Sequence, residues 1–385
     1  MNTIAFKGID GSSPLGILAA LGAMRVISFH DPKATMAWDC SATTHFPVIE
    51  TKLTTDACLR EIRLEALRIA GFPLDYSQRK QEITLEQKTL KAKLDKAQDA
   101  FDKAQATCRR KTADTETRLK REQKLQECAD KLKALQEQWH DFQTNPLHDV
   151  KAWDEEQALV MACDKVHSIL LDTKIKYTLQ EFHCQASNAI DVPASRDARL
   201  FEFFAAFASD GSPMEEKGEV LAGRTDLSLS NGGGEQHLFK DYRNLLPHFN
   251  TQCLHDSLVS GTPWLVEKTN LNWSPDDLKN NALRSNRKED DIKQTDAAMY
   301  AVAFLGLPAF PCMPGSDDLL TTGIAPYGKS EVCFQWPIWD SPATMPIILS
   351  LLRTTAQAKV CTRWFQSRKV LANKRNYFLP AQPVC

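Results

Sequence analysis

The first seventy residues show the alternation and periodicity of short strands and helices. An apolar stretch begins at Ser13 and Pro14, which are typical of a helix start. The serine side chain can accept a hydrogen bond from a backbone N–H of the first turn, and proline has no backbone N–H that would need a partner there. Pro47 falls within an alternating segment and predicts a strand at a sheet edge or at a bulge. The pattern predicts strands over 3–7, 36–40 and 45–51, and helices over 14–27 and 55–70.

The pattern changes sharply at residue 79. From 79 to 138 glycine and proline are absent, and Lys, Glu, Gln, Asp, Ala and Leu dominate. Apolar positions now recur at spacings of three and four, which is the seam of a coiled coil. The seam residues are Leu90, Leu94, Ala97, Phe101, Ala104 and Cys108 in a first arm, and Leu125, Ala129, Leu132 and Trp139 in a second. Residues 109–116 between the arms are polar, so the pattern predicts an antiparallel helical hairpin that turns near 112–115.

Mixed patterns return after residue 146. Segment 197–208 is strongly apolar and predicts a buried helix, while the turn-forming residues after it predict an exposed loop over 209–224. The remaining pattern predicts strands over 177–183, 227–230, 321–323 and 332–339, and helices over 236–246 and 294–307. The basic end of the chain predicts a C-terminal helix.

These elements together predict an α+β fold, a mixed body of short strands and buried helices interrupted by a long antiparallel coiled-coil hairpin. The predicted parts are an N-terminal α+β part of the body over 1–78, a helical-hairpin insertion over 79–140, the main α+β body over 141–350, and a basic C-terminal helix and tail over 351–385.

Charge is nearly balanced over the whole chain, with 47 basic and 49 acidic residues. Residues 79–138 hold 16 basic and 11 acidic side chains, a local net charge of +5 that leaves the rest of the chain at −7. Any affinity for nucleic acid must therefore be local. The hairpin is read either as a solvated coiled-coil face or as a basic arm on a phosphate backbone.

Cysteine usage and the N-terminus predict a soluble, cytoplasmic protein. Eleven cysteines occur without any C-x-x-C pair, and the first residues show no basic segment followed by an apolar run. We expect free, mostly buried thiols and no metal site. No phosphate-binding loop, dinucleotide fingerprint, nucleophile elbow or zinc-protease helix occurs, so we expect a non-catalytic protein without a cofactor.

Three places along the chain are candidates for nucleic-acid binding because they offer cations or unobstructed backbone N–H groups. The candidates are Arg109, Arg110 and Lys111 between the hairpin arms, Gly232, Gly233, Gly234, Lys240 and Arg243 in a glycine-rich loop and its helix, and Arg363, Arg368, Lys369, Lys374 and Arg375 near the C-terminus. Aromatic residues Trp364, Phe365 and Tyr377 lie among the last set, as in proteins that stack bases. The three glycines are also typical of a flexible turn. The C-terminal cations are also typical of the end of an ordinary helix.

Four segments resemble proteins of CRISPR type I-G (formerly I-U) loci, in particular the large-subunit-type proteins of these compact effector complexes. They read GIDGSSPLGILAALGAMR at 8–25, FFAAFASD at 203–210, NGGGEQHLFKDYRNLL at 231–246, and QTDAAMYAVAFLGLPAFPCMPG at 294–315, followed by TTG at 321–323. The resemblance lies on both sides of the hairpin and does not include 79–138.

This resemblance implies a non-catalytic Cascade subunit at one end of the crRNA complex. Such a subunit reads the duplex beside the target, helps to open the DNA and recruits a helicase-nuclease. The implied partners are crRNA, target DNA, the other Cascade subunits and the helicase-nuclease, with no membrane. Two alternatives remain: a coiled-coil interaction scaffold, and an enzyme with a dispersed active site.

Overall fold

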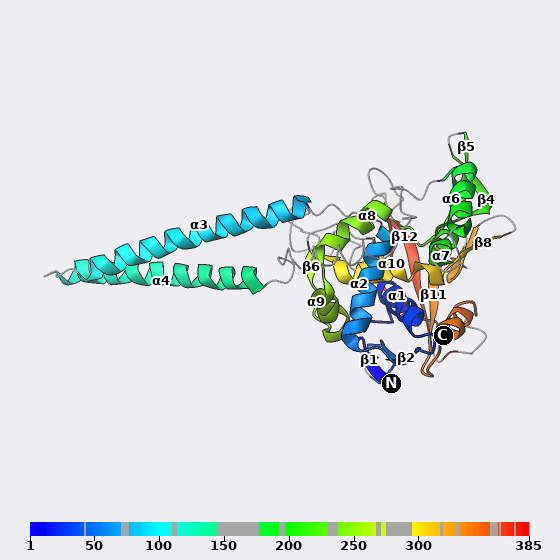
Figure 1. Cartoon of the computed structure of the whole chain (residues 1–385), viewed down its shortest axis with the longest axis horizontal. Helices are drawn as coiled ribbons and strands as arrows, with labels where there is room; N and C mark the ends of the chain where they lie inside the picture. The colour runs from blue at the N-terminus through cyan, green and yellow to red at the C-terminus, as the bar shows by residue number, and fades with distance from the viewer. Residues whose placement is uncertain are drawn as a thin grey trace. The chain divides into compact units, whose positions relative to one another are not determined.

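The computed structural model divides the chain into two compact units, one formed by Met1–Leu74 and Leu159–Cys385 and the other by Asp75–Ala158. Helices and antiparallel strands give the chain an α+β fold (Figure 1). The structure describes residues 1–41, 44–70, 77–109, 114–144, 177–191, 198–216, 218–229, 238–266, 271–274, 295–315, 319–328, 331–354, 361, 363–372 and 375–384. Within these ranges no helix is long and apolar enough to cross a membrane.

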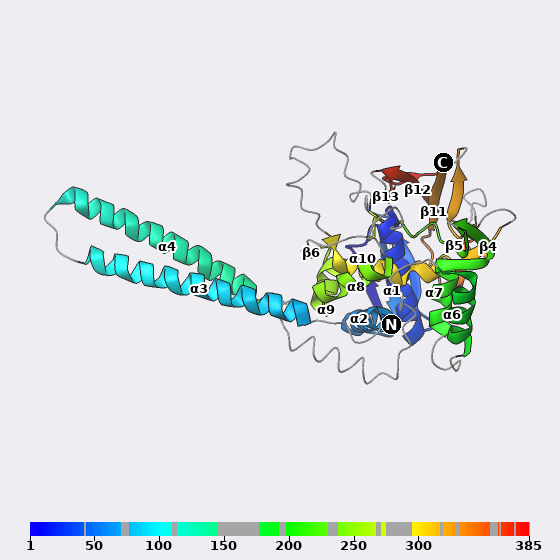
Figure 2. The same cartoon turned by 90° about the horizontal axis from the view of Figure 1, so that it is seen from above.

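Two apolar helices, α1 (Pro14–His30) and α10 (Ala297–Leu305), pack together in the core of the first unit (Figure 2). Gly22 and Gly306 lie at their point of closest approach. A Cβ atom added to Gly22 would lie 2.0 Å from a backbone carbonyl oxygen of α10, and one added to Gly306 would lie 2.1 Å from a carbonyl oxygen of α1. The two backbones can approach this closely because neither glycine carries a side chain.

Side-chain caps begin both of these helices. The Ser13 hydroxyl accepts a hydrogen bond from the N–H of Gly16 at 3.0 Å, and the Asp296 carboxylate accepts one from the N–H of Met299 at 3.1 Å. Each cap satisfies an N–H that has no partner within its helix. The helices predicted over 14–27 and 294–307 are confirmed, and the first begins at the expected proline.

Burial of the Asp296 carboxyl, which also accepts a hydrogen bond from Ser257, raises its pKa to about 6 from the usual 3.8. Between these values the folded chain binds more protons than the unfolded chain, so the free energy of unfolding falls as pH rises through this window. The loss amounts to up to about 3 kcal/mol.

We expect Asp296→Asn to remove this loss while keeping a good helix cap, since asparagine also caps helices well. The variant should match the native chain at pH 4 and exceed it in unfolding free energy at pH 7. Urea unfolding of both proteins at the two pH values measures the difference. An unchanged pH dependence in the variant would show that another group controls it.

The N-terminal sheet has the strand order β1-β3-β2 and confirms the three predicted strands. Its strands are β1 (Asn2–Ala5), β2 (Thr35–Asp39) and β3 (Phe46–Thr51). Because β3 is central, the prediction that Pro47 marks an edge strand or a bulge is wrong. The β1 ladder ends where Ala5 pairs with Val48, so Pro47 lies just beyond it, and its carbonyl still accepts the N–H of Phe6 at 3.0 Å. The missing proline N–H therefore interrupts no registered pair with β1.

The C-terminal part of the first unit is a sheet, so the prediction of a C-terminal helix is wrong. Its strands are β10 (Ile324–Tyr327), β11 (Glu331–Ile338), β12 (Arg363–Ala372), β13 (Arg375–Phe378) and β14 (Gln382–Pro383). They have the order β10-β11-β12-β13, with β14 also paired to β12. Residues of β12 alternate between the two faces of the sheet with period two, and pairing to β11 outweighs any local preference of its cations for a helix.

Backbone and side-chain bonds join the two ends of the sequence within this unit. The N–H of Trp38 donates to the carbonyl of Trp339 at 2.9 Å, and the indole N–H of Trp339 donates to the carbonyl of Met36 at 2.8 Å. The indole N–H of Trp336 reaches the carbonyl of Gly11 at 2.8 Å. The N-terminal and C-terminal sheets therefore share hydrogen bonds across some 300 residues of sequence.

Three further predictions between residues 177 and 230 are wrong. Thr178 forms an isolated bridge and then begins helix α6 (Leu179–Asp191) instead of a strand. Its hydroxyl accepts the N–H of Glu181 at 3.2 Å, and the Glu181 carboxylate accepts the N–H of Thr178 at 2.8 Å, which is a capping box. The predicted loop over 209–224 is a hairpin of β4 (Ala208–Glu216) and β5 (Glu219–Arg224), and 227–229 contains no strand. Turn-forming residues 210–213 lie in a register shift of β4.

Aromatic rings from three helices fill the centre of the first unit. The ring of Phe304 in α10 has its centroid 3.9 Å from that of Tyr242, and 5.8 Å from both Phe203 and Phe207. These rings come from α7 (Ala198–Phe207) and α8 (Leu238–Leu245), which confirm the helices predicted over 197–208 and 236–246. Large buried rings of this kind contribute strongly to stability.

Smaller elements complete the first unit. Helix α2 (Thr55–Ala70) confirms the predicted helix, β11 confirms the strand predicted over 332–339, and the strand predicted over 321–323 instead ends at Thr321. The remaining elements are η3 (Leu246–His248), α9 (Thr251–Leu254), η4 (His255–Ser260), β6 (Leu265–Val266), β7 (Thr295–Asp296), η7 (Leu307–Ala309), β8 (Cys312–Pro314), β9 (Leu319–Thr321) and α11 (Met345–Leu351).

The second unit contains two long helices, α3 (Ser77–Cys108) and α4 (Thr115–Thr144), that contact each other. Every residue of the two predicted seams is buried or half-buried, whereas Leu85 and Leu119, outside the seams, are 68% and 56% exposed. The thiol of Cys108 donates to the carbonyl of Arg121 at 3.1 Å. Residues 112 and 113 of the turn predicted near 112–115 lie outside the described residues, and Thr115 begins α4.

Candidate functional site

The outer face of the C-terminal sheet carries polar side chains. Paired residues of antiparallel strands present their side chains on the same face, and residues two apart share it. Phe334, Trp336 and Ser367 therefore point inward, and each is at most 1% exposed. The residues of the opposite face, which we call the outer face, are Ala325, Tyr327, Glu331, Cys333, Gln335, Trp364, Gln366 and Arg368.

Contacts between neighbouring strands hold the polar groups of this face in place. The guanidinium of Arg368 lies 4.9 Å from the centre of the Tyr327 ring, and its Nη2 donates to the Glu331 carboxylate at 2.6 Å. The Gln335 amide donates to Gln366 Oε1 at 3.2 Å. Arg368 is 39% exposed, and its Nε has no partner among the described residues. The face therefore offers an oriented cation above an aromatic ring.

A cavity of about 250 Å³, which we call the sheet cavity, opens beside the outer face. Its lining includes Gln335 and Trp364 from the sheet and Arg353 from the segment after α11. The Trp364 side chain is 6% exposed, and its indole N–H has no hydrogen-bond partner among the described residues. Arg353 is exposed. The cavity thus presents amide and guanidinium donors beside a buried indole N–H, and these groups suit a ligand rich in acceptors such as a nucleobase or a phosphate.

The predicted C-terminal cations lie on β12 and β13. Arg363 is exposed, and its Nη1 donates to Nε2 of His45 at 2.8 Å. Because arginine can only donate, Nε2 of His45 is the acceptor in this contact, which supplies no negative charge to balance that of Arg363. Lys369 forms an ion pair with Asp226 at 2.8 Å and is 17% exposed, so it is the least accessible of the described set.

The other predicted residues are dispersed. Arg243 donates from Nε to the carbonyl of Ala70 at 2.9 Å, so the last carbonyl of α2 has a hydrogen-bond partner. Lys240 is exposed on α8. Arg109 is exposed at the end of α3, where it donates to Gln105 at 3.2 Å. Candidates outside the described residues are Arg110, Lys111, Gly232, Gly233, Gly234 and Lys374, and nothing is described of the side chain of Arg375. Among the described candidates, Arg363, Arg368 and Lys369 share strand β12, where the register puts Arg363 and Lys369 on the face opposite to Arg368.

No known family model matches the chain, and comparisons with curated proteins and with solved structures find no match either. Within the described ranges, no three His, Cys, Asp or Glu side chains are grouped so that they could hold a metal ion.

Sequence reasoning missed Tyr327, Gln335 and Gln366. Each is a neutral residue in a strand, and only the register of β10, β11 and β12 brings it beside Arg368 or Trp364. The alternation within β11 was the available signal, because it separates inward Phe334, Trp336 and Ile338 from outward Glu331 and Gln335.

Proposed function

We propose that the chain is a non-catalytic, nucleic-acid-binding subunit of a CRISPR type I effector complex, working in the cytoplasm with crRNA, target DNA and other Cascade subunits. In this proposal it contributes to recognition of the sequence flanking the target, to strand opening and to recruitment of a helicase-nuclease. The family part rests on the resemblance of four sequence segments. The binding part rests on the outer face of the C-terminal sheet.

The observation that carries the binding part is the set of donors around the sheet cavity. Arg353 in the cavity and Arg368 on the outer face beside it supply positive charge for phosphate, and the indole N–H of Trp364, which has no partner among the described residues, supplies a donor for a base or a phosphate oxygen. Aromatic rings beside arginine suit single strands, whose bases stack on them in any sequence. The ion pair of Arg368 with Glu331 uses one terminal nitrogen, so other N–H groups of the guanidinium remain for a ligand.

We also propose that α3 and α4 form an antiparallel coiled coil with a basic end. Three of the excess cations of 79–138 are consecutive, Arg109 to Lys111. Outside this run, the segment holds 13 basic and 11 acidic residues, which is close to balance. A phosphate contact of the coiled coil is therefore assigned to this run and not to the helix faces.

We expect Arg353→Gln combined with Arg368→Gln to weaken binding of a labelled 20-nucleotide single-stranded DNA. Loss of two phosphate contacts should lower the slope of log K against log salt by roughly 2 and the affinity at low salt by about tenfold or more. Fluorescence anisotropy over a salt series, with the full-length chain and with DNA and RNA strands, measures both quantities.

Arg60→Gln is the matched control, because Arg60 is 62% exposed on α2, away from the sheet. It should leave the slope unchanged. Trp364→Phe keeps an aromatic ring, though a smaller one, and removes the N–H, and it should reduce affinity with no change in slope. Equal effects of the control and the double variant would refute the sheet as the binding surface, and no binding of native protein at any salt would favour the scaffold alternative.

A further inference from the structure

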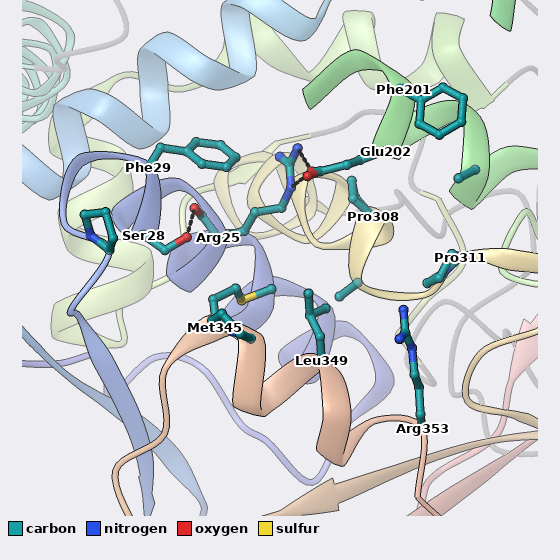
Figure 3. Close-up of a pocket in the computed structure, with 14 residues that line it drawn as sticks. Arg25, Ser28, Phe29, Phe201, Glu202, Pro308, Pro311, Met345, Leu349 and Arg353 are labelled. Carbon is teal, nitrogen blue, oxygen red and sulfur yellow. Dashed lines mark hydrogen bonds and ion pairs between the residues drawn. The ribbon is translucent and has the colours of Figure 1, made fainter. Parts of the chain in front are cut away.

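A second and larger cavity lies on the helical side of the first unit. It has a volume of about 490 Å³ and is lined by α1, α7, η7 and α11 together with residues next to them (Figure 3). We call it the helical cavity. Most of its wall is apolar, with Phe29 from α1, Ala205 from α7 and Leu349 from α11. Its volume lies within the roughly 300–1,000 Å³ of small-ligand sites.

One arginine of the helical cavity is fixed and neutralised. Arg25 is 3% exposed, and both its Nε and its Nη2 donate to the Glu202 carboxylate, at 3.1 and 2.6 Å (Figure 3). Its guanidinium also packs over the rings of Phe29 and Phe203, at 4.8 and 5.0 Å from their centres. The pair stiffens one wall of the cavity and adds no net charge to it.

The second arginine keeps its charge. Arg353 is exposed at the edge of the helical cavity, and its side chain forms no ion pair or hydrogen bond with any described residue. Among the described residues that line this cavity, Glu202 is the only acidic one, and it is engaged by Arg25. The lining therefore combines an apolar interior with one uncompensated positive charge.

The walls of this cavity are preformed. Pro32, Pro308, Pro311 and Pro346 all line it, and proline fixes its own φ angle. A rigid lining lowers the ordering cost of binding. A preformed pocket of this volume favours a small molecule over a protein segment, which needs a larger surface for stable binding.

We propose that the helical cavity binds a small amphipathic anion, with an apolar body against Phe29, Ala205 and Leu349 and a carboxylate paired with Arg353. Medium-chain carboxylates have this chemistry. Binding is favoured because the apolar body is transferred from water to the apolar wall of the cavity. The guanidinium can also donate two hydrogen bonds, one to each carboxylate oxygen. This site shares Arg353 with the sheet cavity, but its apolar wall belongs to other elements, and the proposal does not depend on nucleic-acid binding.

Octanoate and its uncharged counterpart 1-octanol test this proposal on the full-length chain by isothermal titration calorimetry. We expect octanoate to bind more tightly than octanol to the native protein. Arg353→Gln should weaken octanoate binding by about tenfold or more, since charge-assisted pairs are the strong ones, and leave octanol binding unchanged. Ala205→Phe should fill the cavity and abolish binding of both.

Lys240→Gln is the control for loss of an exposed cation, because Lys240 does not line the cavity. It should leave both affinities unchanged. A thermal unfolding curve for each variant shows that it is folded. Octanoate that binds Arg353→Gln as tightly as the native protein would overturn the proposal. Binding of either molecule to Ala205→Phe would overturn it too, and so would a native protein that binds neither molecule.

Discussion

Gly22→Leu is expected to unfold the first unit or to destabilise it severely. An added Cβ at this position would lie 2.0 Å from the carbonyl oxygen of Val302, and a leucine would add three further carbons to the space where α1 meets α10. The obstacle is backbone, so no side-chain rotation can relieve it, and the two central helices must separate. Overpacking of a core costs about 1–3 kcal/mol even where side chains can adjust, so we expect at least about 3 kcal/mol here. Urea unfolding followed by circular dichroism measures the loss.

Gly328→Ala provides the control for this substitution. Nothing lies within 4 Å of an added Cβ at Gly328, and its φ of +66° imposes a backbone cost of about 1–2 kcal/mol only. The expected order of stability is native, then Gly328→Ala, then Gly22→Leu. A Gly22→Leu protein with the native urea midpoint would mean that α1 and α10 do not meet at these glycines.

Phe304→Ala is the second substitution with a large expected effect, about 3–5 kcal/mol in the free energy of unfolding. Phe304 is fully buried, and its ring contacts those of Tyr242, Phe203, Phe207 and Phe239, with centroids 3.9 to 6.4 Å away. Removing it takes the central ring from a cluster supplied by α7, α8 and α10. The neighbours cannot close the space without moving whole helices, so the cost of a cavity adds to the lost burial.

Phe201→Ala is the matched control, because Phe201 is the same residue type on α7 and is 42% exposed. We expect it to cost less than about 1 kcal/mol. Guanidinium unfolding of the three proteins gives the comparison. Equal losses for Phe304→Ala and Phe201→Ala would contradict the central place of the Phe304 ring.

Local signals in the sequence predicted most helices of the first unit. Ser13 and Pro14 mark the start of α1, and α2 has the predicted bounds, because caps and periodicity act within a few residues. The capping box of Thr178 and Glu181 was an equally local signal for α6. The capping box lay within an alternating apolar pattern over 177–183. That pattern led to the prediction of a strand, which was wrong.

The strands near the C-terminus were harder to predict because their partners are remote in sequence. The cations of 363–375 led to the prediction of a helix end. The signal for a strand was the alternation of inward Phe365 and Ser367 with outward Gln366 and Arg368. The close approach of Gly22 and Gly306 is likewise a property of two helices some 280 residues apart. No local pattern specifies which glycines will meet.

The candidate site shows the same division. Arg363, Arg368 and Lys369 were identified from sequence as cations, and the structure places all three on β12. Their accessibility depends on partners that the sequence does not reveal, namely His45 for Arg363, Glu331 for Arg368 and Asp226 for Lys369. Residue type was therefore predictable, and net local charge was not.

The bonds that join Gly11 and Met36 to Trp336 and Trp339 have a consequence for synthesis on the ribosome. The N-terminal sheet is made before its partners, which follow only after about 285 more residues, and that takes roughly 14–57 s at about 5–20 residues per second. During that interval the apolar residues of α1 lack α10, so the nascent chain carries exposed hydrophobic surface. The first unit therefore completes its core only after α10 and the C-terminal strands have been made. Helices α3 and α4, whose partners are close in sequence, can pair much earlier.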